Sequence, residues 1–153
     1  MYSNEESSYI FGDGIWRECN GTFRTSVFVR RKKCVIRGFK IDGNVPNEYE
    51  ASTIREIIND LNKYGKSGTI DIIGHTDSTG SRKHNLKLSE TRAKNFAKLM
   101  REFGLDKRFS FGKIKGEGAN SPVDTDDRAE GRYNNRRVEI FLNNVEFENQ
   151  QSK

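Results

Sequence analysis

The sequence predicts an α+β fold in which one mixed β-sheet carries helices on one of its faces. Short apolar segments typical of strands alternate with two longer segments whose apolar residues recur at three- and four-residue steps. The order strand, helix, strand, helix, strand, strand is typical of an α+β sandwich, because each helix must bury its apolar stripe against the sheet. A chain of 153 residues suits one such domain with an appendage.

The first 36 residues are expected to form an N-terminal extension of β-strands after a polar, disordered start. Aromatic and β-branched residues dominate residues 9–37, and the alternation through Val27 and Val29 is typical of a strand. Asn20-Gly21 predicts a tight turn, and the basic run Arg30-Arg31-Lys32-Lys33 predicts a second one. The basic run could contact an anionic surface, but a solvated hairpin tip is the simpler interpretation.

Residues 37–143 are expected to form the main domain, and residues 144–153 a polar tail, with fraying from Asn143 onward. The sequence predicts helices over residues 47–64 and 82–103, each followed by a glycine, and a helical turn over residues 126–130. It predicts strands over residues 35–41, 69–73, 109–115 and 138–142. The expected buried stripes are Ala51, Ile54, Ile57, Ile58 and Leu61 on the first helix, and Leu86, Ala93, Phe96, Ala97 and Met100 on the second.

Charge and composition limit the class of protein. The net charge of +5 and the pI of about 9.2 favour anionic partners, although they also fit ordinary solubility. No apolar run reaches the length of a membrane span, and no basic-then-apolar signal peptide opens the chain, so we expect a piece of a longer protein. Cys19 and Cys34 fit either a disulfide or two thiols, and their spacing does not indicate a metal site.

A polar cluster follows the central strand. This strand stops at Gly74 and is followed by His75-Thr76-Asp77, and the next helix carries Asn85, Ser89 and Arg92 along one polar edge. A carboxylate after a strand and a guanidinium on the following helix can share a shallow, exposed site. Such a pair suits a ligand that carries both an ammonium and a carboxylate group.

Four sequence blocks resemble the OmpA C-terminal-like family of peptidoglycan-binding domains. They are GHTD at residues 74–77, NLKLSETRA at residues 85–93, GEGANSP at residues 116–122, and GRYNNRRVE at residues 131–139. All four occur in the family's order at ordinary spacing, and the resemblance covers about Phe39 to Leu142. It implies a fold similar to βαβαββ.

The resemblance also implies roles for individual residues in peptidoglycan binding. Asp77 would receive the amine of the stem peptide's diamino acid, diaminopimelate, and Arg92 would bind its carboxylate through two parallel hydrogen bonds. Asn85 and Thr76 would supply neutral donors and acceptors. Each has a structural alternative: Asp77 as a turn cap, an Asp77–Arg92 ion pair without ligand, and helix or loop caps for the other two.

Two further positions complete the expected site. Adjacent strand residues point to opposite faces, so only one arginine of Arg136-Arg137 can face the ligand. The resemblance favours Arg136, near the ligand's terminal carboxylate, and leaves Arg137 as a structural salt-bridge partner. Asp42, after the strand over residues 35–41, best matches the family's polar position there.

The predicted function is non-catalytic peptidoglycan binding in the periplasm of a Gram-negative envelope. It would tether an outer-membrane or envelope protein to the wall, with no cofactor and no nucleic acid. His75 and His84 lack the spacing of a zinc site, and no nucleophile is paired with a base. A basic nucleic-acid-binding domain and a cell-wall hydrolase are the alternatives.

Overall fold

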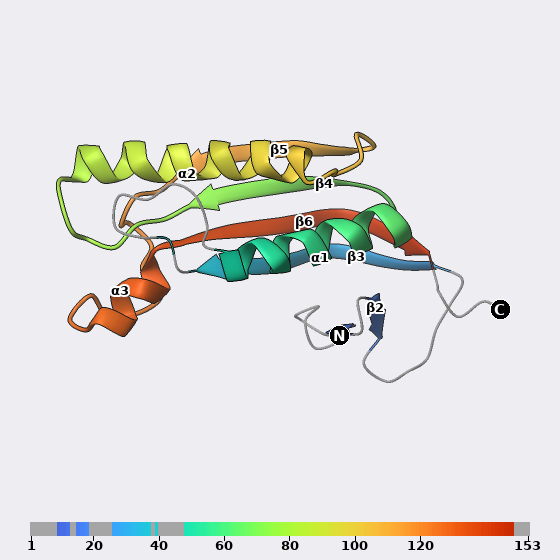
Figure 1. Ribbon diagram of the computed structural model, residues 1–153, viewed down its shortest axis with the longest axis horizontal. Coiled ribbons are helices and arrows are strands. Elements are labelled where there is room, and N and C mark those ends of the chain that lie inside the picture. The colour runs from blue at the N-terminus through green and yellow to red at the C-terminus, as the bar shows by residue number, and fades with distance from the viewer. Residues whose placement is uncertain (1–8, 13–14, 19–25, 38, 40–47, 149–153) are drawn as a thin grey trace.

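The computed structural model describes residues 9–12, 15–18, 26–37, 39 and 48–148 of the chain (Figure 1). Asp42, Cys19 and the Asn20-Gly21 turn signal lie outside these residues. The elements in chain order are β1 (Tyr9–Gly12), β2 (Ile15–Glu18), β3 (Ser26–Arg37), α1 (Glu48–Tyr64), β4 (Gly65–Gly74), α2 (Arg82–Glu102), β5 (Phe109–Gly116), α3 (Ala129–Asn135) and β6 (Arg137–Glu148).

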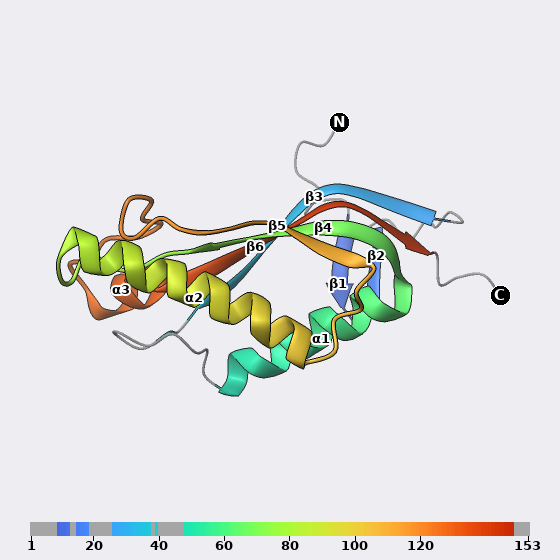
Figure 2. The ribbon, with the colours of Figure 1, turned by 90° about the horizontal axis from the view of Figure 1, so that it is seen from above.

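The main sheet has four strands in the order β3-β6-β4-β5. β4 and β5 run parallel, and the other neighbouring strands are antiparallel. Figure 2 shows that α1 and α2 lie on the same side of this sheet, so its other face carries no helix. The predicted α+β class and the helices on one face are therefore confirmed. β1 and β2 pair with each other as a separate two-stranded sheet.

The core lies between the two helices and the sheet. From α1 it includes Ile54, Ile57, Ile58 and Leu61, as the sequence predicts. Burying an aliphatic side chain of this size contributes roughly 1.5–3 kcal/mol, so this stripe secures α1 against the sheet. Ala93, Phe96, Ala97 and Met100 of α2 are buried as expected, whereas Leu86 is only half-buried. None of the described helices is long and apolar enough to cross a membrane.

The basic run is part of a strand, and the prediction of a turn at residues 30–33 is wrong. β3 continues through it to Arg37, with Arg31 opposite Asn143 and Lys33 opposite Phe141 of β6. The guanidinium of Arg31 lies 4.1 Å from the centre of the Phe141 ring. Long cationic side chains fit in a strand because their aliphatic part packs on a neighbouring side chain while the charged group stays in water.

The last strand is longer than predicted, and the expected fraying from Asn143 is wrong as far as Glu148. Val145 and Phe147 are buried, and β6 pairs with both β3 and β4 along this stretch. Asn143 and Asn144 interrupt the apolar pattern and conceal this continuation in the sequence. β3 therefore crosses the expected boundary between extension and domain at residues 36/37, and β6 crosses the one between domain and tail at residues 143/144. The division into extension, domain and tail remains a prediction.

Two element boundaries also shift. Gly65, expected as a helix cap, is the first residue of β4, and the expected turn over residues 126–130 is replaced by α3, which begins at Ala129. Gly104 follows α2 with a φ of 99°, in the left-handed region where glycine ends helices without strain.

Candidate functional site

All four sequence blocks meet at the end of β4. The backbone N–H of His75 donates to the carbonyl of Arg137 (2.9 Å), and that of Thr76 donates to the carbonyl of Gly118 (2.9 Å). The Ser89 hydroxyl of α2 accepts a hydrogen bond from the N–H of Gly118 (2.8 Å). These bonds hold the loop after β4, the turn after β5 and the start of β6 together, which places residues far apart in the sequence in one small region.

Two glycines allow α2 to approach this region closely. A Cβ atom on Gly74 would lie 2.1 Å from the carbonyl oxygen of Ser89, and one on Gly116 would lie 2.2 Å from the backbone nitrogen of Glu90. Any side chain at either position would push α2 away from the strand ends. The glycines of the first and third blocks therefore serve helix–sheet packing.

Asp77 forms an ion pair with Arg136. Its Oδ2 lies 2.9 Å from Nη1 of Arg136, and its Oδ1 accepts a hydrogen bond from the N–H of Thr79 (2.9 Å). The carboxylate side chain is 4% exposed and the guanidinium side chain 15%. Nε of Arg136 also donates to the carbonyl of Phe39 (2.6 Å). The Asp77 carboxylate thus neutralises Arg136, whose side chain is the more exposed of the two.

Arg92 lies deeper, and the expectation of an exposed Arg92 and Asp77 at the rim is wrong. Arg92 is 0% exposed and Asp77 3%. Nη1 of Arg92 donates to the carbonyl of His75 (2.8 Å), and its guanidinium lies 5.2 Å from the centre of the Phe39 ring. The helical edge that carries Arg92 faces the strand-end loop and not solvent, because Gly74 and Gly116 let α2 pack closely there.

The neutral residues of the expected site are also buried. Asn85 is 4% exposed, and its side-chain amide donates to the carbonyl of Asp77 (3.4 Å). Thr76 is 4% exposed, and within the described part of the chain its hydroxyl has no hydrogen-bond partner. The structure therefore brings together Asp77, Arg92, Asn85, Thr76 and Arg136; Asp42 lies outside the described residues.

A second charged network, which the sequence does not reveal, lies beside the site. Nε of Arg137 donates to Oε2 of Glu139 (2.8 Å), and Nε2 of His75 lies 3.4 Å from Oε1 of the same carboxylate. Contact with His75, and then with Arg137, outweighs the effect of burial and holds the pKa of Glu139 at about 2. Arg137 is thus a structural salt-bridge partner, as the sequence suggests. It pairs with Glu139 because the two residues lie two positions apart on the same face of β6.

The loop before α3 is held by a buried amide. Asn135 is 0% exposed; its Oδ1 accepts from the N–H of Val123 (2.8 Å), and its Nδ2 donates to Oδ1 of Asp126 (2.7 Å). The other oxygen of Asp126 accepts from the N–H of Ser78, in the loop that carries Asp77 (2.8 Å). The asparagine of the fourth block thus indirectly braces the Asp77 loop.

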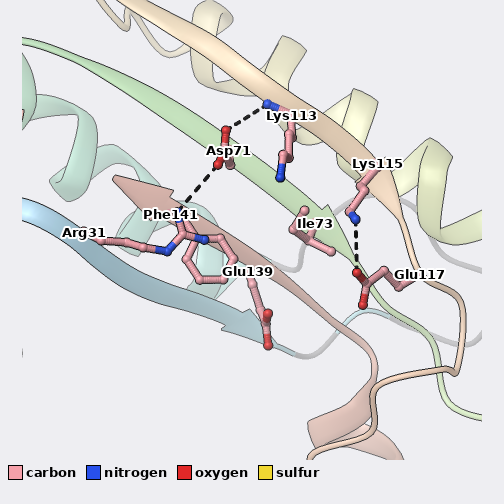
Figure 3. Close-up of a pocket in the computed structure, with 8 residues that line it drawn as sticks. All are labelled: Arg31, Asp71, Ile73, Lys113, Lys115, Glu117, Glu139 and Phe141. Atoms are coloured by element: carbon pink, nitrogen blue, oxygen red, sulfur yellow. Dashed lines mark hydrogen bonds and ion pairs between the residues drawn. The ribbon is translucent and has the colours of Figure 1, made fainter. Parts of the chain in front are cut away.

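The helix-free face of the sheet carries a groove of about 390 Å³ (Figure 3). Arg31 of β3 and Lys113 and Lys115 of β5 line its two sides, and Asp71, Ile73, Glu117, Glu139 and Phe141 complete it. Much of its charge is compensated internally, because Arg31 lies 3.7 Å from Asp71 and Lys115 lies 3.4 Å from Glu117. Among the described residues, no group of three or more histidine, cysteine or acidic side chains could hold a metal ion.

Comparison with known proteins reveals relatives from bacterial cell envelopes. The chain is 37% identical over 92 residues to the probable lipoprotein YiaD of Escherichia coli, a match that covers 60% of this chain and 41% of the lipoprotein. It is 40% identical over 74 residues to outer membrane protein A of Bordetella avium, covering 48% of this chain and 37% of that protein. The matched part of the chain spans less than half the length of these curated relatives.

Solved structures have the same fold. The cell wall anchor of the T6SS from Pseudomonas aeruginosa superposes with a TM-score of 0.60 at 29% identity, over 78% of this chain and 88% of the anchor. The periplasmic domain of Helicobacter pylori MotB gives a TM-score of 0.64 at 25% identity, over 78% of this chain and 79% of that domain. The model of the OmpA family matches residues 39–136, which is more than half of the sequence and includes most of the four blocks. The chain therefore belongs to the OmpA family.

Proposed function

We propose that this domain binds peptidoglycan noncovalently at the end of β4 and so tethers an envelope protein to the cell wall in the periplasm. The observation that carries the proposal is the pairing of Asp77 with Arg136 at 2.9 Å, in a loop whose backbone at His75 binds the guanidinium of Arg92. Two guanidinium groups and one carboxylate in one region match the amine and carboxylates of a diamino acid. Family membership and the cell wall anchor among the relatives support the same function.

The proposed ligand is the diaminopimelate of the stem peptide. Asp77 receives its ammonium, and Arg136, whose side chain is the more exposed partner of the ion pair, turns to its carboxylate. A zwitterionic ligand can replace the Asp77–Arg136 pair, because its ammonium would pair with Asp77 and its carboxylate with Arg136. Neither side chain is then left buried and unpaired. Arg136 keeps a second anchor during this exchange, because its Nε binds the carbonyl of Phe39.

The inner residues have supporting roles in this proposal. Arg92 binds the carbonyl of His75 and so holds the loop that carries Asp77, while its charge attracts the ligand's carboxylate from behind. Asn85 holds the backbone of Asp77 in the same way. The buried hydroxyl of Thr76, which has no partner among the described residues, offers a hydrogen bond to the ligand. Asp42 remains a proposed contributor from the preceding loop.

The proposed role is binding without catalysis. The site offers ion pairing and hydrogen bonding, and its charged groups are arranged to satisfy one another and not to activate a nucleophile. Binding of this kind would anchor the longer protein to which the domain belongs. We propose an outer-membrane-associated protein, as the relatives' names suggest.

Purified, insoluble cell walls provide the test. The domain should bind diaminopimelate-type walls at least about tenfold more tightly than lysine-type walls, because lysine lacks the second carboxylate and leaves a guanidinium without its partner. Co-sedimentation with both wall types at equal mass measures this ratio. Equal binding to both walls would show that the domain does not recognise the second carboxylate of diaminopimelate. Binding to neither wall would exclude the proposed function.

A further inference from the structure

The excess positive charge of the chain is concentrated in one strand. β3 contains five basic residues and no acidic residue: Arg30, Arg31, Lys32, Lys33 and Arg37. The whole chain has 27 basic and 22 acidic residues, so the residues outside β3 carry 22 of each and are balanced. The net charge of +5 therefore equals the charge of β3 alone.

This strand lies at the edge of the sheet. In the order β3-β6-β4-β5, β3 has one hydrogen-bonded neighbour among the strands that the structure describes, β6. An edge strand directs half of its backbone N–H and C=O groups away from the sheet, where they can pair with a further strand. β3 is twelve residues long, roughly twice the usual length of a strand. The long edge strand β3 is therefore also the strand that carries the excess positive charge.

Several of these cations have no internal partner. Arg30, Lys33 and Arg37 are exposed, and none forms an ion pair or a side-chain hydrogen bond with the described part of the protein. Arg31 differs, since it contacts Asp71 and Phe141. Alternation along the strand places Arg31, Lys33 and Arg37 on the helix-free face, where Figure 3 shows Arg31 at the side of the groove. Lys33 and Arg37, which form no ion pair within the described part of the chain, thus point to the same face of the strand.

The geometry points to β3 as a docking edge for an extended acidic segment of a partner protein, which would add to the sheet as a fifth strand. An added strand has the same two-residue period, so acidic residues at alternate positions would lie opposite Lys33 and Arg37. Backbone hydrogen bonds supply the affinity in such strand addition, and the facing side chains supply the specificity.

Charge also excludes a second copy of this chain as the occupant. Pairing of two β3 strands would place cations opposite cations, which is unfavourable. Charged edges commonly prevent such self-association, but one or two charges suffice for that purpose. Arg30, Lys33 and Arg37, which are exposed and form no ion pair within the described part of the chain, also select the sign of the partner. The proposed edge ends at Arg37, which lies opposite Arg137 near the end of β4, but the proposal does not depend on peptidoglycan binding.

An acidic octapeptide that alternates glutamate and threonine, with blocked ends, tests the proposal on the full chain at low salt. Its affinity is measured by fluorescence anisotropy, and protection of β3 amides is measured by hydrogen exchange. Lys33→Glu/Arg37→Glu should weaken binding at least about tenfold. The matched control, Lys87→Glu/Lys98→Glu, makes the same charge change at two exposed positions of α2 and should bind as the wild type does.

The backbone is tested separately with the same peptide N-methylated at alternate residues, which keeps its charges but removes half of its amide donors. Strand addition predicts at least about a tenfold loss for this peptide, together with loss of the added protection of β3 amides. Equal binding of the methylated peptide, equal protection by inorganic polyphosphate, an equal loss in the α2 control, or no binding of the unmodified peptide would each overturn the proposal.

Discussion

Asp77 and Arg136 are 59 residues apart in the sequence and form an ion pair of 2.9 Å at the end of β4. The pair joins the block that follows the central strand to the block that begins the last one. Arg136 occupies the Asp77 carboxylate that the ammonium of the proposed ligand would use, so the ligand must replace Arg136 as the partner of Asp77. Substitutions in this region therefore need to separate loss of the site from loss of the fold.

Asp77→Asn should abolish most wall binding while the domain stays folded. The amide oxygen still accepts from the N–H of Thr79, but an NH2 group replaces the oxygen that pairs with Arg136, and the charge that attracts an ammonium is lost. Loss of one charged partner of a ligand costs roughly 2–5 kcal/mol in binding. Co-sedimentation with diaminopimelate-type walls measures the change. Asp127→Asn, the same substitution at an exposed position, is the control; unchanged binding by Asp77→Asn would place the site elsewhere.

Arg92→Ala should lower the free energy of unfolding by roughly 2–5 kcal/mol, because it leaves a cavity and an unpaired buried carbonyl. Arg92 heads the largest fully buried side chains of the described part of the chain, and it donates to the carbonyl of His75. Urea unfolding measures the loss. Lys98→Ala, at an exposed position of the same helix, should stay within about 0.5 kcal/mol of the wild type. An Arg92→Ala variant of wild-type stability would show that the guanidinium is not a structural support.

Glu139→Gln should remove a source of acid sensitivity. Its interactions with His75 and Arg137 lower the pKa of Glu139 from 4.5 to about 2. A lowered carboxylate pKa stabilises the fold above pH 4.5, and this stabilisation disappears as the pH falls towards 2. The wild type should exceed the variant by on the order of 3 kcal/mol near neutral pH, and this difference should shrink between pH 4.5 and 2. Urea unfolding across this range measures it. A difference that does not change with pH would contradict the ion pairing, and Glu130→Gln, at an exposed position, provides the reference.

Asp60→Asn should stabilise the protein at alkaline pH. Burial, and then the nearby Glu56, raise the pKa of Asp60 from 3.8 to about 7. A raised carboxylate pKa means that stability is complete below pH 3.8 and is lost as the pH rises through 7. The variant should match the wild type near pH 4 and exceed it by on the order of 2 kcal/mol at pH 8. Thermal unfolding at both pH values tests this. Parallel stability curves for the two proteins would show that Asp60 does not titrate in this way.

The sequence by itself determined the class of the fold and grouped residues that the structure brings together at the end of β4. The stripe from Ile54 to Leu61 has a helical period. The apolar run around Ile72 predicts a strand, but its expected cover on both faces is wrong, because both long helices lie on one side of the sheet (Figure 2). These are local patterns, which is why α1 and α2 begin and end within a residue of their predicted limits. The four blocks also identified the residues that converge at the end of β4.

The tertiary structure alone decided which of these side chains are buried and which charges pair. Periodicity places Arg92 on a polar edge of α2, but whether that edge faces solvent depends on how closely the helix approaches the sheet. Gly74 and Gly116 set this distance. The pairing of Asp77 with Arg136 and of His75 with Glu139 likewise depends on strand order, because β6 lies next to β4. The same order makes β3 an edge, so a basic run that the sequence placed in a turn becomes an exposed strand, since long-range pairing and not local propensity determines where a strand ends.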